Sequence, residues 1–192
     1  MTGGVLILVV GPSGAGKDAL LAAAREAYAG DARFRFVRRA ITRPAEAGGE
    51  PHEAVSEAVF ATRGFALSWR AHGLAYGIPA DIAADLAAGR VVVANVSRTV
   101  IAEAARRFPV RVIAVTAPPA VLAARLAARG REDAAGTARR LVRAVGLPAE
   151  VPIETMANDA TLAEGVTRFL AALSRAAADA PPAGTAFPPP PG

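Results

Sequence analysis

The sequence contains no cysteine, and only one of its 22 basic residues is a lysine, Lys17. Without cysteine the chain can form no disulfide, no thiolate metal site and no thiol nucleophile. No hydrophobic run approaches the roughly 20 residues that a membrane-spanning helix needs. The apolar run Val5–Val10 is not preceded by a Lys or Arg, as the basic start of a signal peptide would require. We therefore expect a cytoplasmic protein with no membrane partner.

The remaining basic residues are all arginines, and they give a net charge of +5. A basic chain invites a nucleic-acid partner, but such a partner requires cations gathered into one patch. Here no more than two cations are adjacent, and aromatic residues make up only 5% of the chain. We expect no nucleic-acid partner. A basic nucleic-acid-binding module stays the distant alternative, and duplex binding with a steep salt dependence would reveal it.

Short apolar segments alternate with segments of helical composition along most of the chain. This alternation predicts an α/β domain over residues 1–175, with a parallel sheet and helices on both of its faces. Residues 44–79 do not alternate, so we predict an insertion there. Residues 176–192 are rich in Ala and Pro and are expected to form a disordered tail. The predicted strands are 5–10, 34–41, 91–96, 110–116 and 151–156, and the predicted helices are 18–28, 82–88, 100–108, 121–129, 137–145 and 162–178.

A glycine-rich segment, G-P-S-G-A-G-K-D, follows the first predicted strand and precedes the first helix. It matches the Gly-x-x-x-x-Gly-Lys pattern of a P-loop at every fixed position. Glycines let successive backbone N–H groups converge on an anion, and the lysine reaches the β- and γ-phosphates. An ordinary glycine-rich turn needs no lysine. We therefore predict a P-loop NTPase fold that binds ATP through Gly11, Pro12, Ser13, Gly14, Ala15, Gly16, Lys17 and Asp18.

The last residue of this loop, Asp18, stands where Ser or Thr is usual. The usual hydroxyl binds Mg²⁺, and an acid on a later strand commonly completes the site. The later strand at 91–96 carries Asn95 in place of an acid. We therefore predict that Asp18 binds Mg²⁺, directly or through water. The alternative is an acid that merely stabilises the start of the helix.

Three further stretches resemble the guanylate-kinase-like family over residues 5–159. They are T-R at 42–43 after the second strand, Y-G at 76–77, and R-G-R-E at 129–132. The resemblance implies that 44–79 binds the phosphate acceptor and that 125–143 is a lid over the transferring phosphate. It also implies that Asn158 contacts the adenine side of ATP, and it assigns catalysis to Lys17, Arg125, Arg129, Arg131 and Arg139.

The chain departs from that family where guanine is read. Ser68 and Asn95 replace two acids, and Glu46 replaces a phosphate-binding arginine. Guanine N–H groups left without acceptors would cost ~1–3 kcal/mol each. Four motifs together resemble instead the ribose 1,5-bisphosphate phosphokinase branch: the loop ending in G-K-D, I-T-R-P at 41–44, S-W-x-A-H-G-L-x-Y-G at 68–77 and R-G-R-E at 129–132. In that branch a sugar phosphate accepts the γ-phosphate of ATP. The residues expected to bind this acceptor are Arg39, Thr42, Arg43, Arg70, His72, Tyr76, Gly77, Asn95 and Arg98.

Several alternatives stay open at this stage. The nearest is guanylate kinase or another nucleoside monophosphate kinase. A non-catalytic interaction domain of the same family is disfavoured because such domains tend to lose the loop lysine and the lid arginines. His72 has the alternative of being an exposed turn histidine. The sequence leaves the oligomeric state open, with a homodimer as one option.

Overall fold

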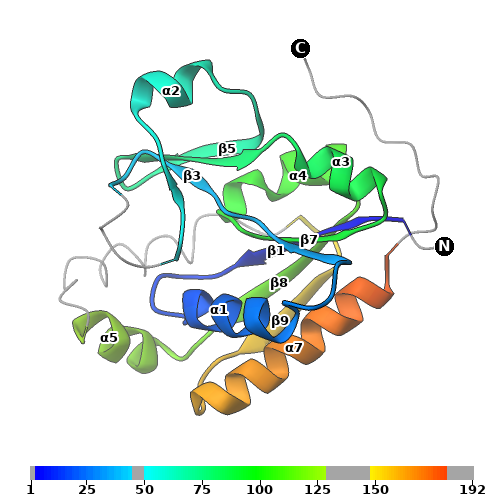
Figure 1. Ribbon diagram of the computed structural model, residues 1–192. Coiled ribbons are helices and arrows are strands. Elements are labelled where there is room, and N and C mark those ends of the chain that lie inside the picture. Colours follow the sequence, from blue (N-terminus) through cyan, green and yellow to red (C-terminus); the bar gives the residue numbers. More distant parts are fainter. Residues whose placement is uncertain (1–2, 45–49, 129–147, 181–192) are drawn as a thin grey trace.

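The computed structural model describes residues 3–44, 50–128 and 148–180 (Figure 1). Its centre is a five-stranded sheet in the order β2-β7-β1-β8-β9, and every pair of neighbours is parallel. The strands of this sheet are β1 (Val5–Val10), β2 (Phe34–Phe36), β7 (Val91–Asn95), β8 (Val110–Thr116) and β9 (Ile153–Ala157). The helices around it are α1 (Lys17–Ala27), α3 (Ile82–Ala87), α4 (Ile101–Arg107), α5 (Pro119–Ala127) and α7 (Leu162–Ala178), and a 3-10 turn, η2 (Arg98–Val100), precedes α4.

Strand β1 is buried on both faces because helices cover the sheet on both sides. Its residues 6, 8 and 10 belong to one core cluster, which includes residues of α3 and α4. Its residues 5, 7 and 9 belong to a second cluster, which includes residues of α1 and α7. A continuous apolar run such as V-L-I-L-V-V is typical of a parallel strand buried in this way. The predicted α/β fold with helices on both faces is confirmed.

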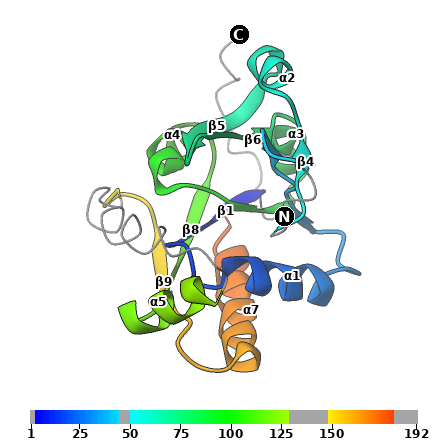
Figure 2. The ribbon, with the colours of Figure 1, turned by 90° about the vertical axis from the view of Figure 1, so that its left-hand side faces the viewer.

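A second, four-stranded sheet forms the part of the chain between β2 and α3. Its order is β4-β3-β6-β5, with β5 and β6 joined as an antiparallel hairpin. Its elements are β3 (Ala40–Ile41), β4 (Glu53–Ala54), α2 (Glu57–Thr62), β5 (Phe65–Ala71) and β6 (Leu74–Pro79). Figure 2 shows β5, β6 and α2 on the opposite side of the central sheet from α1 and α7. We call this unit the side sheet.

The prediction of one strand over 34–41 is wrong. The Val37 N–H still donates to Val93 O of the central sheet, but β3 pairs with β6 of the side sheet. The chain therefore passes from one sheet to the other between residues 37 and 40. The side sheet begins before residue 44, where the insertion was expected to start.

The C-terminal helix α7 has the predicted bounds. It starts in a capping box between Thr161 and Glu164, which satisfies N–H groups at the first turn. Ala176 is buried in the core, so the expected start of the tail at residue 176 is wrong, because the helix continues through Ala178. The predicted helix at 137–145 and most of the predicted lid lie outside the described residues. Among the described residues, no helix is long and apolar enough to cross a membrane.

Candidate active site

The glycine-rich loop lies between the carboxyl end of β1 and the start of α1, as predicted. Gly11 and Gly16 have φ values of 152° and 88°, which side chains with a Cβ rarely adopt. A Cβ on Gly11 would also lie 2.2 Å from Val115 O of β8. The loop thus follows a path that only glycine permits at these points, tight against the neighbouring strand.

Lys17 is the first residue of α1, and its side chain folds back over the loop. Its Nζ donates to Gly11 O at 2.8 Å and to Pro12 O at 3.1 Å. The pKa of this ammonium is lowered from 10.5 to about 8, chiefly by burial and in part by the nearby charges of Arg39 and Arg98. Desolvation and neighbouring cations both disfavour the charged form, so a bound phosphate would relieve a cost already present in the free protein.

Asp18 lies in the first turn of α1, directly after this lysine, and its negative charge raises the Lys17 pKa. It forms no hydrogen bond or ion pair with another described residue, so its carboxylate is available to a ligand. The described residues contain no group of three acids or histidines that could coordinate a metal unaided. A cation held by one carboxylate together with phosphate oxygens and water, as Mg²⁺ prefers, is compatible with this arrangement.

The loop is supported from the other side by Asn158, which follows β9. Its Nδ2 donates to Ala15 O at 2.8 Å, and its own N–H donates to Thr116 O at 2.7 Å. The amide fits closely, because a Cβ on Gly16 or on Gly165 of α7 would lie 2.4 Å from one of its atoms. Asn158 was expected to contact the adenine side of ATP, and in the structure its amide nitrogen bonds to the phosphate loop.

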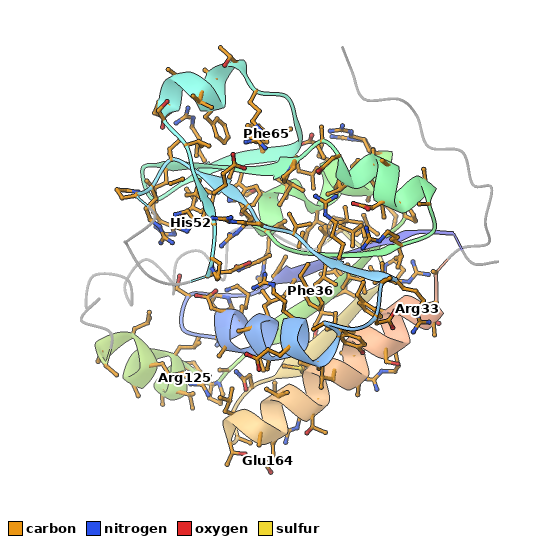
Figure 3. The ribbon with its side chains drawn as sticks, in the orientation of Figure 1. Arg33, Phe36, His52, Phe65, Arg125 and Glu164 are labelled. Carbon is orange, nitrogen blue, oxygen red and sulfur yellow. The ribbon has the colours of Figure 1, made fainter. Side chains whose placement is uncertain are left out.

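Arg125 of α5 approaches the same place from below the loop in the view of Figure 3. Its Nη1 donates to Asn158 O at 3.0 Å and lies 3.5 Å from Gly14 O. Beside it is a cavity of about 320 Å³ lined by Gly16, Ala19, Arg125, Ala128, Asn158 and Leu162. This mainly apolar hollow, next to the phosphate loop, has the position and character suited to a nucleotide base.

On the acceptor side, Arg39 is held by an aromatic stack. The Trp69 and Tyr76 rings are parallel within 4°, with centroids 5.3 Å apart. The Arg39 guanidinium carbon lies 5.6 Å from the Tyr76 ring centre, a cation–π arrangement. Trp69 also packs against the main core. The stack thus presents Arg39 and Tyr76 from the side sheet.

Gly77 lies beside this stack, in the middle of the side sheet. A Cβ there would lie 2.4 Å from the Phe65 ring, so this position has no room for a larger residue. Gly77 was expected to bind the acceptor, and the structure gives it a packing reason that is sufficient by itself.

Thr42 and Arg43 directly follow β3, which lies between β4 and β6 in the same sheet. The Thr42 hydroxyl accepts the Ala75 N–H at 2.8 Å. Besides the hydrogen bond from Arg70, one from the Thr42 side chain lowers the pKa of Glu57. Arg43 Nη2 lies 3.4 Å from Nδ1 of His52, a buried histidine that our sequence reasoning missed. The His52 ring bridges the main chain at Arg43 O and Glu50 O, each 3.2 Å away, and Figure 3 shows it within the side sheet. His52 therefore fixes the backbone that carries Arg43.

Glu50 is the second residue that sequence reasoning missed. Its side chain is only 4% exposed, and its Oε2 accepts from Arg39 Nη2 at 3.1 Å and from Asn95 Nδ2 at 2.7 Å. Asn95 ends β7, in register with Val9 at the end of β1. Asn95 was expected to touch the acceptor, but its amide nitrogen is used on Glu50. The segment G-G-E at 48–50 was visible in the sequence, but nothing local indicated these partners.

The other predicted acceptor residues are less closely gathered. Arg98, on η2, is half-buried, near enough to Lys17 to lower its pKa, and has no ion pair with a described residue. Arg70 pairs with Glu57 on the surface. His72 occupies the exposed turn of the β5–β6 hairpin with a φ of 51°, beside Gly73 at 73°. Two successive positive φ values suit a type I′ turn, so His72 has the expected alternative role. Arg129, Arg131 and Arg139 lie outside the described residues.

Two comparisons address the family. No protein-family model matches the chain. Among curated proteins, it is 54% identical over 175 residues to ribose 1,5-bisphosphate phosphokinase PhnN of Acidiphilium cryptum, a match that covers 90% of this chain and 93% of that protein. The chain belongs to the ribose 1,5-bisphosphate phosphokinase family. The Methylobacterium radiotolerans phosphokinase of the same name is 48% identical, over 88% of this chain and 97% of its own length.

The solved structures agree with the fold of a ribose 1,5-bisphosphate phosphokinase. Guanylate kinase from Anaplasma phagocytophilum superposes with a TM-score of 0.63, over 91% of this chain and 87% of that one. Its sequence identity is only 14%, so it shows a shared fold and nothing about the acceptor. The predicted guanylate-kinase-like P-loop fold is therefore confirmed, whereas the guanylate kinase alternative rests on fold alone.

Proposed function

We propose that the protein transfers the γ-phosphoryl group of ATP to the 1-phosphate of ribose 1,5-bisphosphate, giving 5-phosphoribosyl 1-diphosphate and ADP. The observation that carries this proposal is the 54% identity to a ribose 1,5-bisphosphate phosphokinase over almost the full length of both proteins. The site supports it, since a phosphate loop with its lysine faces a set of cations across the end of the central sheet. The acceptor is then a small sugar phosphate.

The transfer forms a bond between an oxygen of the acceptor's 1-phosphate and the γ-phosphorus of ATP, and it breaks the bond from that phosphorus to the β–γ bridging oxygen. The attacking oxygen is already ionised near neutral pH, so no general base is required. Catalysis of this kind depends on positioning and on neutralising charge. Lys17 and the loop N–H groups hold the donor, while Arg39, Thr42, Arg43 and Tyr76 face the acceptor.

Four arginines of the predicted lid segment, 125–143, are expected to take part in the transfer as well. Arg125 lies at the described end of the lid segment, where it braces Asn158 and lines the cavity suited to the base. Arg129, Arg131 and Arg139 are proposed to bring their charges to the transferring phosphate from the lid, as the family resemblance implies. Each would neutralise negative charge that develops during transfer.

Mg²⁺ is proposed as the metal, with Asp18 as its protein ligand. When bound, it would neutralise charge on the phosphates of ATP. We expect Asp18→Asn to raise the Mg²⁺ concentration needed for half-maximal activity by about 10-fold, because a neutral amide is a weaker ligand than a carboxylate. The control is Asp31→Asn, which removes a surface carboxylate paired with Arg33. An Mg²⁺ requirement that is unchanged in Asp18→Asn would rule out the metal role.

The acceptor is tested by ADP release with a panel of ribose 1,5-bisphosphate, GMP and AMP. We expect turnover with the sugar bisphosphate and little with the nucleotides. The exposed Ser68 hydroxyl and the Asn95 amide stand where guanine recognition would need carboxylates. Turnover of GMP alone would overturn the proposed function in favour of a guanylate kinase.

A further inference from the structure

The buried carboxylate of Glu50 lies where the side sheet meets the phosphate loop. It belongs to the chain segment that enters β4, yet its partners come from elsewhere. Arg39 precedes β3, and Asn95 ends the central strand β7, 45 residues away in sequence. Its charge also acts on Lys17, whose pKa it raises. Glu50 is therefore close to both the donor side and the acceptor side of the site.

The two oxygens of this carboxylate differ in their surroundings. Both hydrogen bonds, from Arg39 and from Asn95, go to Oε2. Oε1 makes no hydrogen bond with a described residue. Oε1 is also not among the fully covered side-chain atoms that lack a partner in the described residues. The two hydrogen bonds at Oε2 therefore fix the direction of Oε1, which is still open to a ligand.

The charges around Glu50 show what kind of group Oε1 can accept. Lys17, Arg39 and Arg98 supply positive charge for phosphates. A carboxylate repels phosphate and can only accept hydrogen bonds, so it serves a ligand that brings O–H or N–H groups. Ribose 1,5-bisphosphate has such donors only in its ring hydroxyls, on the two carbons beyond the one that carries the reacting phosphate.

We propose that Glu50 Oε1 accepts a hydrogen bond from a ring hydroxyl of the sugar acceptor and so determines specificity for a ribose rather than a deoxyribose. This inference rests on the proposed function. The Arg39 and Asn95 hydrogen bonds hold the carboxylate by Oε2, so the ribose meets an acceptor that is already in place. Arg39, stacked on Tyr76, has Nη1 left for the phosphates, since Nη2 donates to Glu50 and Nε is fully covered.

The test compares kcat/KM for ribose 1,5-bisphosphate with kcat/KM for its 2-deoxy and 3-deoxy analogues, in the wild-type protein and in Glu50→Gln. A hydrogen bond to a charged group changes such a ratio by about 10- to 100-fold. We expect the wild type to disfavour at least one deoxy analogue by this factor. Glu50→Gln should lose activity mainly on the ribose substrate, so that its preference falls to within a few-fold of unity.

The matched control is Glu53→Gln, three residues along, where an exposed carboxylate pairs with Arg63. It should keep the wild-type preference. If Glu50→Gln does not fold, Glu50→Asp replaces it, since a carboxylate shortened by one carbon should also lose most of the preference.

Three results would overturn the inference. In the first, the wild type uses both deoxy analogues as well as the ribose substrate. In the second, the Glu50 variant loses the same factor on all three substrates, which means that Glu50 only holds Arg39. In the third, the wild type does not phosphorylate ribose 1,5-bisphosphate at all, and then the proposed function fails as well. The first two leave the proposed function standing.

Discussion

Replacing Asn158 by alanine should loosen the phosphate loop from beneath. In the wild type, Asn158 Nδ2 donates to Ala15 O at 2.8 Å, and Ala15 is fully buried. Alanine at 158 removes this donor and leaves a carbonyl in the interior without a partner. An unsatisfied buried group of this kind costs about 1–3 kcal/mol. For a domain of this size each kcal/mol lowers Tm by about 2–4 °C, so we expect a drop of roughly 2–12 °C.

The same substitution should weaken ATP binding more than the chemical step. The loop N–H groups converge on phosphate only while the loop keeps its path, and Asn158 fills the space between Gly16 and Gly165. We expect KM for ATP to rise by about 10-fold, since about 1.4 kcal/mol corresponds to one decade. Thermal unfolding and initial rates at varied ATP concentration measure the two effects.

The neighbouring residue provides the control. Asp159→Asn alters an exposed carboxylate that pairs with Arg168, and surface pairs contribute about 0–1 kcal/mol. It should leave Tm and KM for ATP close to those of the wild type. An Asn158→Ala protein with the wild-type Tm and an unchanged KM for ATP would show that Asn158 does not support the loop.

Three further predictions concern the loop lysine and the scaffold. Lys17→Arg should lower kcat/KM on the order of 100-fold without unfolding the protein, because a planar guanidinium cannot take the place of a compact ammonium that reaches two loop carbonyls. Circular dichroism checks the fold and initial rates check the activity. Rates near those of the wild type would contradict this prediction. Burial alone would raise the pKa of Asp85, but hydrogen bonds from two arginines hold it below its ordinary value. The contribution of Asp85 to the free energy of unfolding is therefore fully present above that ordinary value, and it is lost as pH falls through the folded pKa. Asp85→Asn should therefore be about 1–3 kcal/mol less stable to urea than the wild type at pH 7, and this difference should shrink as pH falls below 3.8. A difference that does not shrink would be inconsistent with this sign. Gly77→Ala should lower the free energy of unfolding by about 1–3 kcal/mol, because its Cβ would meet the Phe65 ring. The control Gly64→Ala, with open space around it, should lower it little. Equal effects of the two substitutions in thermal or urea unfolding would contradict the close packing at Gly77.

The central sheet could be predicted from the sequence because its signals are local. The strand 110–116 and the helix 162–178 have the predicted bounds, since an apolar run and a helical repeat each lie within one short segment. The strand 34–41 could not be divided correctly, because leaving one sheet for another depends on the distant partners Val93 and Gly77. Local pattern does not reveal which strand pairs with which.

The candidate site shows the same limit. The phosphate loop and Lys17 form a contiguous motif, so the sequence revealed their place and their chemistry. Glu50 and His52 were missed because their importance comes from partners far along the chain or from bridging contacts to main-chain carbonyls. Asn158 was predicted to bind nucleotide, but only its buried position shows that its amide supports the loop.

The acceptor is identified most directly by the ³¹P NMR spectrum of ribose 1,5-bisphosphate incubated with the protein, ATP and Mg²⁺. We predict that the 1-phosphate signal is replaced by the two coupled signals of a diphosphate ester, in step with the appearance of ADP. A 1-phosphate signal that persists while ATP is consumed, or that persists with no consumption of ATP, would contradict the assignment of this sugar phosphate as the acceptor.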